Sequence, residues 1–479
     1  MWWSCRFFKW FHQKVVWVPM AFHVGHLCCA RPDINAVAQY RTRCGGRIVT
    51  RKWSNWAGNQ HSRPRVVETP KSEQDVVVAI LRATQLGLRV KAIGSGHSFT
   101  AISKPDEMML DMSRLNAVIE VDAAHGVVRV QSGIVLSDLN EYLEKHGLSM
   151  PNLGDVAYQS LAGSMSTSTH GTGLSRTGLA AQILGFRMVL ASGEVIVCSA
   201  DENQEIFHCG RVSLGALGVI TEYSIRVVPL FNLQAVEQPM RVSDVLAQFE
   251  QLISDNDFFE FYWIPHTKWA LTKANNVTSA PPDPPTRLST WVHKMVLENF
   301  AFGVLCRIGK AFPAMIPRFA TMLPSAGRVE FVNVSHRVFS SKRLVRFCEM
   351  EYSISIDAVG KALNEIMLMI DHRNLKISFP IEVRCTGRDD IPLSTSTGRE
   401  SAYIAVHMYK GCDYDEYFTA VEEILLKYEG RPHWGKIHNL DGSQLSSLYP
   451  EYQRFIEVRN QLDPEGVFTN DYLRRVLGR

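Results

Sequence analysis

A strand that runs directly into a glycine loop is the feature that most limits how this chain can fold. The apolar segment Val90–Ile93 is followed without a break by Gly94-Ser95-Gly96-His97-Ser98. Upstream, Ser72-x-x-Asp75 predicts the start of a helix and Gly87 its end, after a short strand at Arg65–Val67. The chain is therefore expected to form a β-α-β unit whose second strand presents the glycine loop at its end.

This loop differs from a Rossmann motif in two respects. It has no third glycine, and Phe99-Thr100 leads to a turn at Pro105 and a further strand instead of a helix. Nicotinamide binding of the Rossmann kind is therefore disfavoured. A glycine turn can still bind a pyrophosphate, because successive backbone N–H groups form a concavity that no Cβ atom obstructs.

A second segment, Ser160–Gly173, offers the same chemistry as a loop of small polar residues. Each segment alone is most often only a surface turn, and a lone histidine is most often a hydrogen-bonded structural residue. Here, however, each segment contains a histidine that a turn does not need, His97 and His170. Together the two segments predict a site for a dinucleotide held along its length.

Two motifs in the carboxyl-terminal half predict chemistry. Glu382 and Arg384 are two residues apart on a predicted strand, so both side chains point to one face. Arginine can orient an oxygen of a hydroxylated substrate while glutamate accepts its proton, although E-x-R is also common on surface strands. The loop His433-Trp-Gly-Lys436 places a fixed cation that would stabilise negative charge developing in a reaction; the alternative is a solvated lysine.

These motifs resemble those of the sugar-lactone oxidases of the vanillyl-alcohol oxidase superfamily, from Arg65 to the carboxyl terminus. The resemblance implies an α+β fold, with a two-subdomain FAD-binding domain of the PCMH type over residues 60–230. An α+β substrate domain of the aldonolactone oxidase type follows over residues 231–479. It also implies FAD bound covalently through His97, with further contacts from Gly94, Ser95, Gly96, Ser98, Ser164, Ser166, Thr169, His170, Gly171, Thr172 and Ile220.

The resemblance further places Glu382, Arg384 and His407 on the substrate side and Lys436 at the flavin. It implies oxidation of the C2 hydroxyl of arabinono-, galactono- or gulono-1,4-lactone to ascorbate or an analogue such as erythroascorbate, with oxygen as acceptor. The alternatives are an alditol or polyol oxidase, a lactone dehydrogenase that uses cytochrome c, and a flavin-binding scaffold without catalysis. No metal site is expected, since His433 and His438 lack further ligands at the spacing of a zinc site.

Composition bears on partners and location. The chain has 479 residues, more than one hydrophobic core usually accommodates. Residues 1–52 carry nine Lys or Arg and one acid, Asp33, a charge of +8 that leaves −5 for the rest of a chain of net charge +3. A nucleic-acid surface on the body is therefore disfavoured. The basic, aromatic leader predicts an organellar address, a mitochondrial one included, or an interfacial membrane anchor; a start at Met20 is the alternative.

Overall fold

The computed structural model describes residues 52–286, 299–322, 327–341 and 343–478. Arg47–Arg479 form one compact unit of mixed helices and sheets, so the predicted α+β class is confirmed. The leader predicted over residues 1–52 lies outside the described part, except for Lys52. In the described part, no helix is both long enough and apolar enough to cross a bilayer.

A three-stranded parallel sheet contains the predicted β-α-β unit. Its strands follow the order β3 (Val66–Glu68), β5 (Met108–Asp111), β4 (Val90–Ile93), so β5 lies between the two strands of the unit. The connecting helix α2 (Glu73–Gln85) begins with the predicted capping box of Ser72 and Asp75. The sheet brings the glycine loop to the end of β4, as predicted.

A five-stranded antiparallel sheet follows. Turns at Asp122–Gly126 and Ser192-Gly193 predict two strand pairs, Val118–Val121 with Val127–Gln131 and Phe186–Leu190 with Val195–Cys198. Both pairs are confirmed, as β6 with β7 and β9 with β10. Its strands are, in spatial order, β10 (Val195–Ser199), β9 (Ile183–Val189), β11 (Val219–Arg226), β7 (Val127–Gln131) and β6 (Val118–Asp122). The smaller elements around it are η1 (Met112–Arg114), α3 (Leu136–Lys145), β8 (Leu148–Ser149), α4 (Leu161–Ser166), η2 (Leu179–Gln182), α5 (Gln204–Gly210) and β12 (Val228–Pro229).

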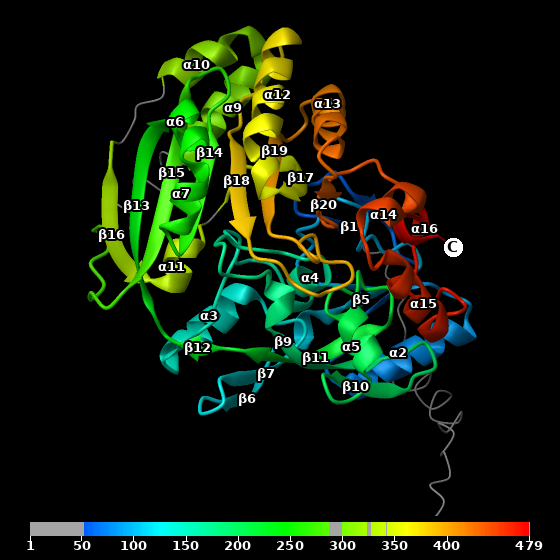
Figure 1. Cartoon of the computed structure of the whole chain (residues 1–479). Coiled ribbons are helices and arrows are strands. Elements are labelled where there is room, and N and C mark those ends of the chain that lie inside the picture. Colours follow the sequence, from blue (N-terminus) through cyan, green and yellow to red (C-terminus); the bar gives the residue numbers. More distant parts are fainter. Residues whose placement is uncertain (1–51, 287–298, 323–326, 342, 479) are drawn as a thin grey trace, which may run out of the picture. The chain divides into compact units, whose positions relative to one another are not determined.

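An eight-stranded antiparallel sheet forms the second half (Figure 1). Its strands are, in spatial order, β16 (Val329–Val334), β13 (Asn232–Arg241), β15 (Trp269–Thr278), β14 (Phe258–Trp263), β18 (Ile381–Thr386), β19 (Ser401–Tyr409), β17 (Phe347–Ser355) and β20 (Arg431–Pro432). The helices of this half are α6 (Val242–Ala247), α7 (Phe249–Ser254), α9 (Phe302–Ala311), α10 (Ile316–Met322), α11 (Ser335–Phe339), α12 (Val359–His372) and α13 (Asp415–Leu426), with η4 (Pro313–Met315) and η5 (Ile356–Ala358). The strands predicted at Phe258–Ile264, Ile381–Cys385 and Tyr403–Met408 are β14, β18 and β19.

The last three helices return to the first half of the chain. They are α14 (Gly442–Leu448), α15 (Tyr452–Leu462) and α16 (Asp471–Leu477). The segment between α15 and α16 contacts the parallel sheet. The backbone N–H of Val90 donates to the carbonyl of Val467 in this segment at 2.7 Å, and Phe468 joins the core of the parallel sheet. The sequence does not predict this return, and the domain boundary at residue 230 stays a prediction.

Two elements differ from the sequence expectation. Residues Leu161–Ser166, predicted as part of a loop, form the short helix α4, whose Leu161 and Met165 are fully buried. The helix predicted at Val245–Ile253 is two helices, α6 and α7, that meet at Gln248. In both cases the burial of apolar side chains decides a structure that local propensity leaves open.

Candidate active site

The glycine loop leaves the sheet at a buried strand and reaches the surface at once. Ile93 is buried, whereas Gly94 and Ser95 are exposed. Gly96 has φ +68°, a left-handed conformation that glycine adopts without a steric cost. A Cβ atom on Gly94 would lie 1.8 Å from Ser160 Oγ, at the start of the second small-residue segment. The two segments that the sequence singled out are therefore in contact.

Most hydroxyl groups of the second segment bind the protein itself. Ser164 Oγ donates to the Leu161 carbonyl at 2.8 Å, and Ser166 Oγ accepts from Ser213 Oγ at 3.0 Å. Thr172 Oγ1 donates to the Phe259 carbonyl. Thr169 Oγ1, in contrast, is buried without a hydrogen-bond partner among the described residues. A buried hydroxyl without a partner, in the segment that contacts the glycine turn through Ser160, fits a bound cofactor that supplies the missing partner.

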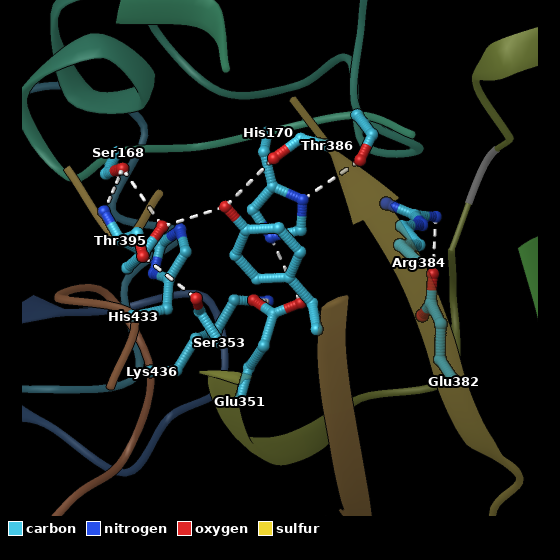
Figure 2. Close-up of polar contacts among 12 residues, drawn as sticks. Ser168, His170, Glu351, Ser353, Glu382, Arg384, Thr386, Thr395, His433 and Lys436 are labelled. Carbon is cyan, nitrogen blue, oxygen red and sulfur yellow. Dashed lines mark hydrogen bonds and ion pairs between the residues drawn. The ribbon is translucent and has the colours of Figure 1, made fainter. Parts of the chain in front are cut away.

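His170 is a buried link between the two halves of the chain. Its Nε2 lies 3.2 Å from Glu351 Oε1, and its ring stacks on Tyr403 with 3.4 Å between centroids (Figure 2). Its Nδ1 lies 2.9 Å from the Gly171 carbonyl. These contacts fit the alternative given for a lone histidine in the sequence, which is a hydrogen-bonded structural residue. A contact of His170 or of the buried Ile220 with the cofactor stays a prediction.

A cavity of about 240 Å³ lies where the glycine loop meets the eight-stranded sheet. The charged and aromatic residues that line it are Trp56, His97, Phe99, Tyr158, Arg343, Phe347, Glu349, His433 and Lys436. Of the residues predicted for chemistry, His97 and Lys436 therefore share one cavity. Glu382, Arg384 and His407 are buried but do not line it.

Two hydrogen bonds join the loop that contains Lys436 to the loop that contains His97. Phe99 N–H donates to the Gly435 carbonyl at 2.7 Å, and Thr100 Oγ1 donates to the Trp434 carbonyl at 3.0 Å. Burial, with a further contribution from the Lys436 charge, lowers the pKa of His97 to about 4. The imidazole is therefore neutral at neutral pH and carries a free lone pair.

Two carboxylates that the sequence analysis did not identify hold Lys436. Its Nζ forms a short ion pair with Glu349 Oε1 and lies 3.9 Å from Glu351 Oε2. Glu349 Oε1 also lies 3.5 Å from His407 Nε2. Burial alone lowers the pKa of Lys436, but the two carboxylates raise it above its usual value. Lys436 is thus a fixed cation, as predicted. The sequence signal that could have identified these partners is the pair of acidic residues in the otherwise apolar segment Phe347–Tyr352.

The backbone of the same strand fixes the lysine loop. His433 N–H donates to the Glu351 carbonyl at 3.0 Å, and Ile437 N–H donates to the Glu349 carbonyl at 2.9 Å. Burial lowers the pKa of His433 to about 3, so this ring is neutral. A loop anchored at both ends by one strand holds its lysine in one place.

Glu382 and Arg384 lie side by side on β18, as their spacing predicts. Arg384 Nη2 is 2.5 Å from Glu382 Oε1, and Arg384 Nε donates to Glu260 Oε2 at 2.8 Å. Burial raises the pKa of Glu382. Arg384 Nη2 also lies 3.7 Å from Asp155 Oδ2, to which the cavity residue Arg343 donates at 2.8 Å. The E-x-R pair therefore reaches the cavity through Asp155 and Arg343.

Asp155 joins these two arginines. Burial alone would raise the pKa of Asp155, but the Arg384 and Arg343 guanidinium groups hold it below its usual range. The carboxylate therefore stays ionised near neutral pH and keeps Arg343 at the cavity wall.

Replacing Gly94 by alanine is expected to lower the flavin content of the purified protein severalfold. The added Cβ would lie 1.8 Å from Ser160 Oγ and 2.7 Å from Ser160 Cβ, which forces the two small-residue segments apart. Gly360→Ala is the matched control, since a Cβ there meets no atom within 4 Å. The ratio of flavin to protein absorbance measures the effect, and equal ratios in both variants would contradict it.

Comparisons with known proteins agree with this geometry. The family model described as D-arabinono-1,4-lactone oxidase matches residues 223–476, and that of an FAD binding domain matches residues 64–199. L-gulono-1,4-lactone dehydrogenase of Mycobacterium tuberculosis is 41% identical over 432 residues, which cover 89% of this chain and 99% of the relative. L-gulonolactone oxidase of Bos taurus is 33% identical over 433 residues, covering 89% and 98%.

More distant relatives share the same architecture. D-arabinono-1,4-lactone oxidase of Eremothecium gossypii is 26% identical, covering 87% of this chain and 93% of the relative. Among solved structures, a solvent-stable cholesterol oxidase superposes with a TM-score of 0.77 at 19% identity, covering 90% of this chain and 98% of that one. At this identity the likeness shows the fold alone.

Fold and site together define an FAD-dependent oxidoreductase with a vanillyl-alcohol-oxidase-type flavin-binding domain. The match over residues 223–476 and the relative at 41% identity then fix the family. The chain belongs to the D-arabinono-1,4-lactone oxidase family of aldonolactone oxidases and dehydrogenases. The predicted cofactor, FAD, is confirmed by the FAD binding domain over residues 64–199.

Proposed function

We propose that this protein oxidises the C2 hydroxyl of an aldono-1,4-lactone in the cavity shared by His97 and Lys436, with oxygen as electron acceptor. The observation that carries the proposal is the fixed Lys436 cation, held against Glu349 in the same cavity as the histidine of the glycine loop. A buried cation next to a flavin stabilises the negative charge that develops on reduction. The names of the relatives support a lactone as the substrate.

FAD, when bound, supplies an acceptor for the hydride that leaves C2 of the lactone. Lys436 holds a positive charge at the site where the acceptor gains electrons. Glu382, Arg384 and His407 remain proposed site residues, and each acts through a group that it holds. Arg384, fixed by Glu382, orients Arg343 through Asp155. His407 contacts Glu349 and so sets the position of the Lys436 ammonium group.

The product proposed for this reaction is the 2-keto lactone, which tautomerises to an enediol such as ascorbate or erythroascorbate. Loss of the hydroxyl proton must accompany loss of the hydride. Glu349 is the carboxylate that lines the cavity, while Glu382 lies behind its wall. Burial alone would raise the pKa of Glu349, but the Lys436 charge brings it below its usual value. Glu349 is therefore ionised and able to accept a hydrogen bond from the substrate.

We further propose that FAD is attached covalently through His97. The neutral imidazole at the cavity and its glycine-flanked, solvent-reachable loop support this proposal. Bond formation joins an imidazole nitrogen to the flavin's 8α methyl carbon. One hydrogen leaves each partner, the two electrons pass to the flavin ring, and molecular oxygen takes them to give hydrogen peroxide.

Turnover assays separate this proposal from its alternatives. We expect the purified protein to oxidise L-gulono-, L-galactono- or D-arabinono-1,4-lactone faster than xylitol or sorbitol. An oxygen electrode records oxygen consumption, and parallel anaerobic assays record cytochrome c reduction. Faster turnover of the polyols would favour a polyol oxidase, and turnover with cytochrome c alone would favour a dehydrogenase.

For the leader we propose an organellar address or an interfacial membrane anchor, on the basis of its charge and aromatic content. Deleting residues 1–52 tests this without touching the cavity. The shortened protein should keep its turnover rate while its distribution between membrane and supernatant fractions changes. An unchanged distribution would contradict both roles.

A further inference from the structure

A hairpin that precedes the matched FAD binding domain packs against the His97 loop. It comprises β1 (Trp53–Ser54), β2 (His61–Ser62) and the loop between them, and we call residues 53–62 the amino-terminal hairpin. It lies outside both matched family regions, residues 64–199 and 223–476. Trp53 and Asn55 are nonetheless buried, with exposed fractions of 8% and 4%. Trp53 packs with Ile93 and Met109 of the parallel sheet, and Asn55 hydrogen-bonds to the glycine loop.

Asn55 organises the hairpin. Its Oδ1 accepts three backbone N–H groups, from Gly58 at 3.0 Å, Asn59 at 3.1 Å and Gln60 at 3.0 Å. The Asn55 amide nitrogen donates to Asn59 Oδ1 within the hairpin at 2.6 Å and also makes a bond outside it. Nδ2 donates to the Ser98 carbonyl at 2.9 Å, one residue after His97. One side chain thus folds the hairpin and ties it to the glycine loop.

Two further hydrogen bonds complete the attachment. Trp56 N–H donates to the Gly96 carbonyl at 2.8 Å, and Asn59 Nδ2 donates to the Phe99 carbonyl at 2.9 Å. The peptide groups on both sides of His97 are therefore held by the hairpin. Glycine makes the His97 loop flexible, so its rigidity comes from the hydrogen bonds to the hairpin and not from the parallel sheet.

The hairpin also holds the histidine ring itself. The Trp56 indole stacks on the His97 imidazole, with 5.4 Å between centroids and 22° between planes. The indole is fixed in turn by an edge contact with Phe347, with 5.4 Å between centroids and 74° between planes. Trp56 and His97 both line the cavity. The imidazole therefore meets the cavity in an orientation that the indole restricts.

We propose that Trp56 and Asn55 of the amino-terminal hairpin are positioning residues for attachment of the flavin to His97. This proposal rests on the covalent bond of the proposed function, whose formation is balanced as written there. Attack by a ring nitrogen requires a near-attack geometry, and a misplacement of about 1 Å costs on the order of 10²-fold in rate. Asn55 fixes the position of the glycine loop through its bond to the Ser98 carbonyl. Trp56 fixes the orientation of the His97 ring by stacking on it.

The test measures the fraction of flavin that is covalent in the full-length purified protein. In-gel flavin fluorescence after denaturing electrophoresis gives the covalent flavin, and absorbance before denaturation gives the total. We expect Trp56→Leu to lower the covalent fraction at least fivefold while total flavin changes less. Trp56→Phe keeps an aromatic face and should restore most of it. Trp269→Leu, at a tryptophan that is 43% exposed on β15, is the control.

Asn55→Asp separates positioning from folding. An aspartate keeps the Oδ1 acceptor for the three hairpin N–H groups but loses the donor to the Ser98 carbonyl and to Asn59 Oδ1. Because the three backbone bonds remain, we expect a melting temperature close to that of the wild type with a lowered covalent fraction. Wild-type covalent fractions in both Trp56→Leu and Asn55→Asp would overturn the proposal, as would total and covalent flavin falling in parallel. A wild-type band without fluorescence would overturn the covalent bond itself, and the proposal with it.

Discussion

Replacing Lys436 by methionine is expected to lower the rate of flavin reduction by the lactone by about 10²–10³-fold, the range found when one preorganised electrostatic group is removed. Methionine keeps the length of the side chain and removes its charge. Glu349, which lines the cavity, would then lose its ion pair with the ammonium group. Uncompensated negative charge opposes transfer of a hydride to the flavin. Anaerobic stopped-flow absorbance measures the rate.

The control for this prediction is Lys427→Met. Lys427 forms an ion pair with Glu365, but its side chain is 61% exposed, so its charge is largely screened by solvent. Its reduction rate should stay within about twofold of the wild type, since exposed pairs contribute little. If Lys436→Met also stayed within this range, Lys436 would be a structural lysine and the proposed role would be wrong.

The second large effect is expected for His97→Ala, which should remove covalent flavin entirely. The variant should still bind FAD, because the glycine turn and the second small-residue segment are unchanged. Its yellow colour should then be released by acid, whereas that of the wild type should stay with the precipitated protein. The measurement is flavin absorbance in the supernatant after acid precipitation.

His125→Ala is the matched control, since His125 is 80% exposed and pairs only with Asp122 among the contacts described. It should retain flavin in the precipitate as the wild type does. Covalent flavin in His97→Ala would place the bond at another residue. Release of flavin from the wild type would show that the cofactor is bound without a covalent link.

Local signals in the sequence predicted the elements that local interactions determine. The capping box at Ser72 and Asp75 involves residues three positions apart, and both are found as predicted. Glu382 and Arg384 share a face because a strand alternates every second residue. The glycine loop follows β4 directly along the chain, so the strand predicted at Val90–Ile93 places the loop at its end. In each case the groups concerned are near neighbours along the chain, so their separation in sequence determines how they lie in the structure.

The partners of the site residues could not be predicted, because they come from distant segments. Glu349 and Glu351 meet Lys436 across more than eighty positions of sequence, through the pairing of β17 with β20. Asp155 and Glu260 surround Arg384 in the same way. An E-x-R motif predicts a neighbouring carboxylate and guanidinium group. The burial of both groups depends on the packing of β14 against β18, which the motif does not predict.

This packing bears on the roles proposed for the site residues. Glu382, Arg384 and His407 are predicted on the substrate side, and that role stays a prediction. In the structure Arg384 reaches Arg343 through Asp155, and His407 contacts Glu349; Arg343 and Glu349 line the cavity. His97 and Lys436 line the same cavity, while their contacts with the flavin stay predictions. The amino-terminal hairpin adds a support for His97 that no motif indicated.

The most direct test of the central claim is an anaerobic titration of the purified protein with aldono-1,4-lactones. The account predicts that at least one lactone bleaches the visible absorbance of the oxidised flavin, and that admitting air restores it. Lys436→Met should bleach far more slowly under the same conditions. A flavin that every lactone leaves oxidised, in a protein whose flavin dithionite reduces normally, would contradict the claim that this cavity oxidises sugar lactones.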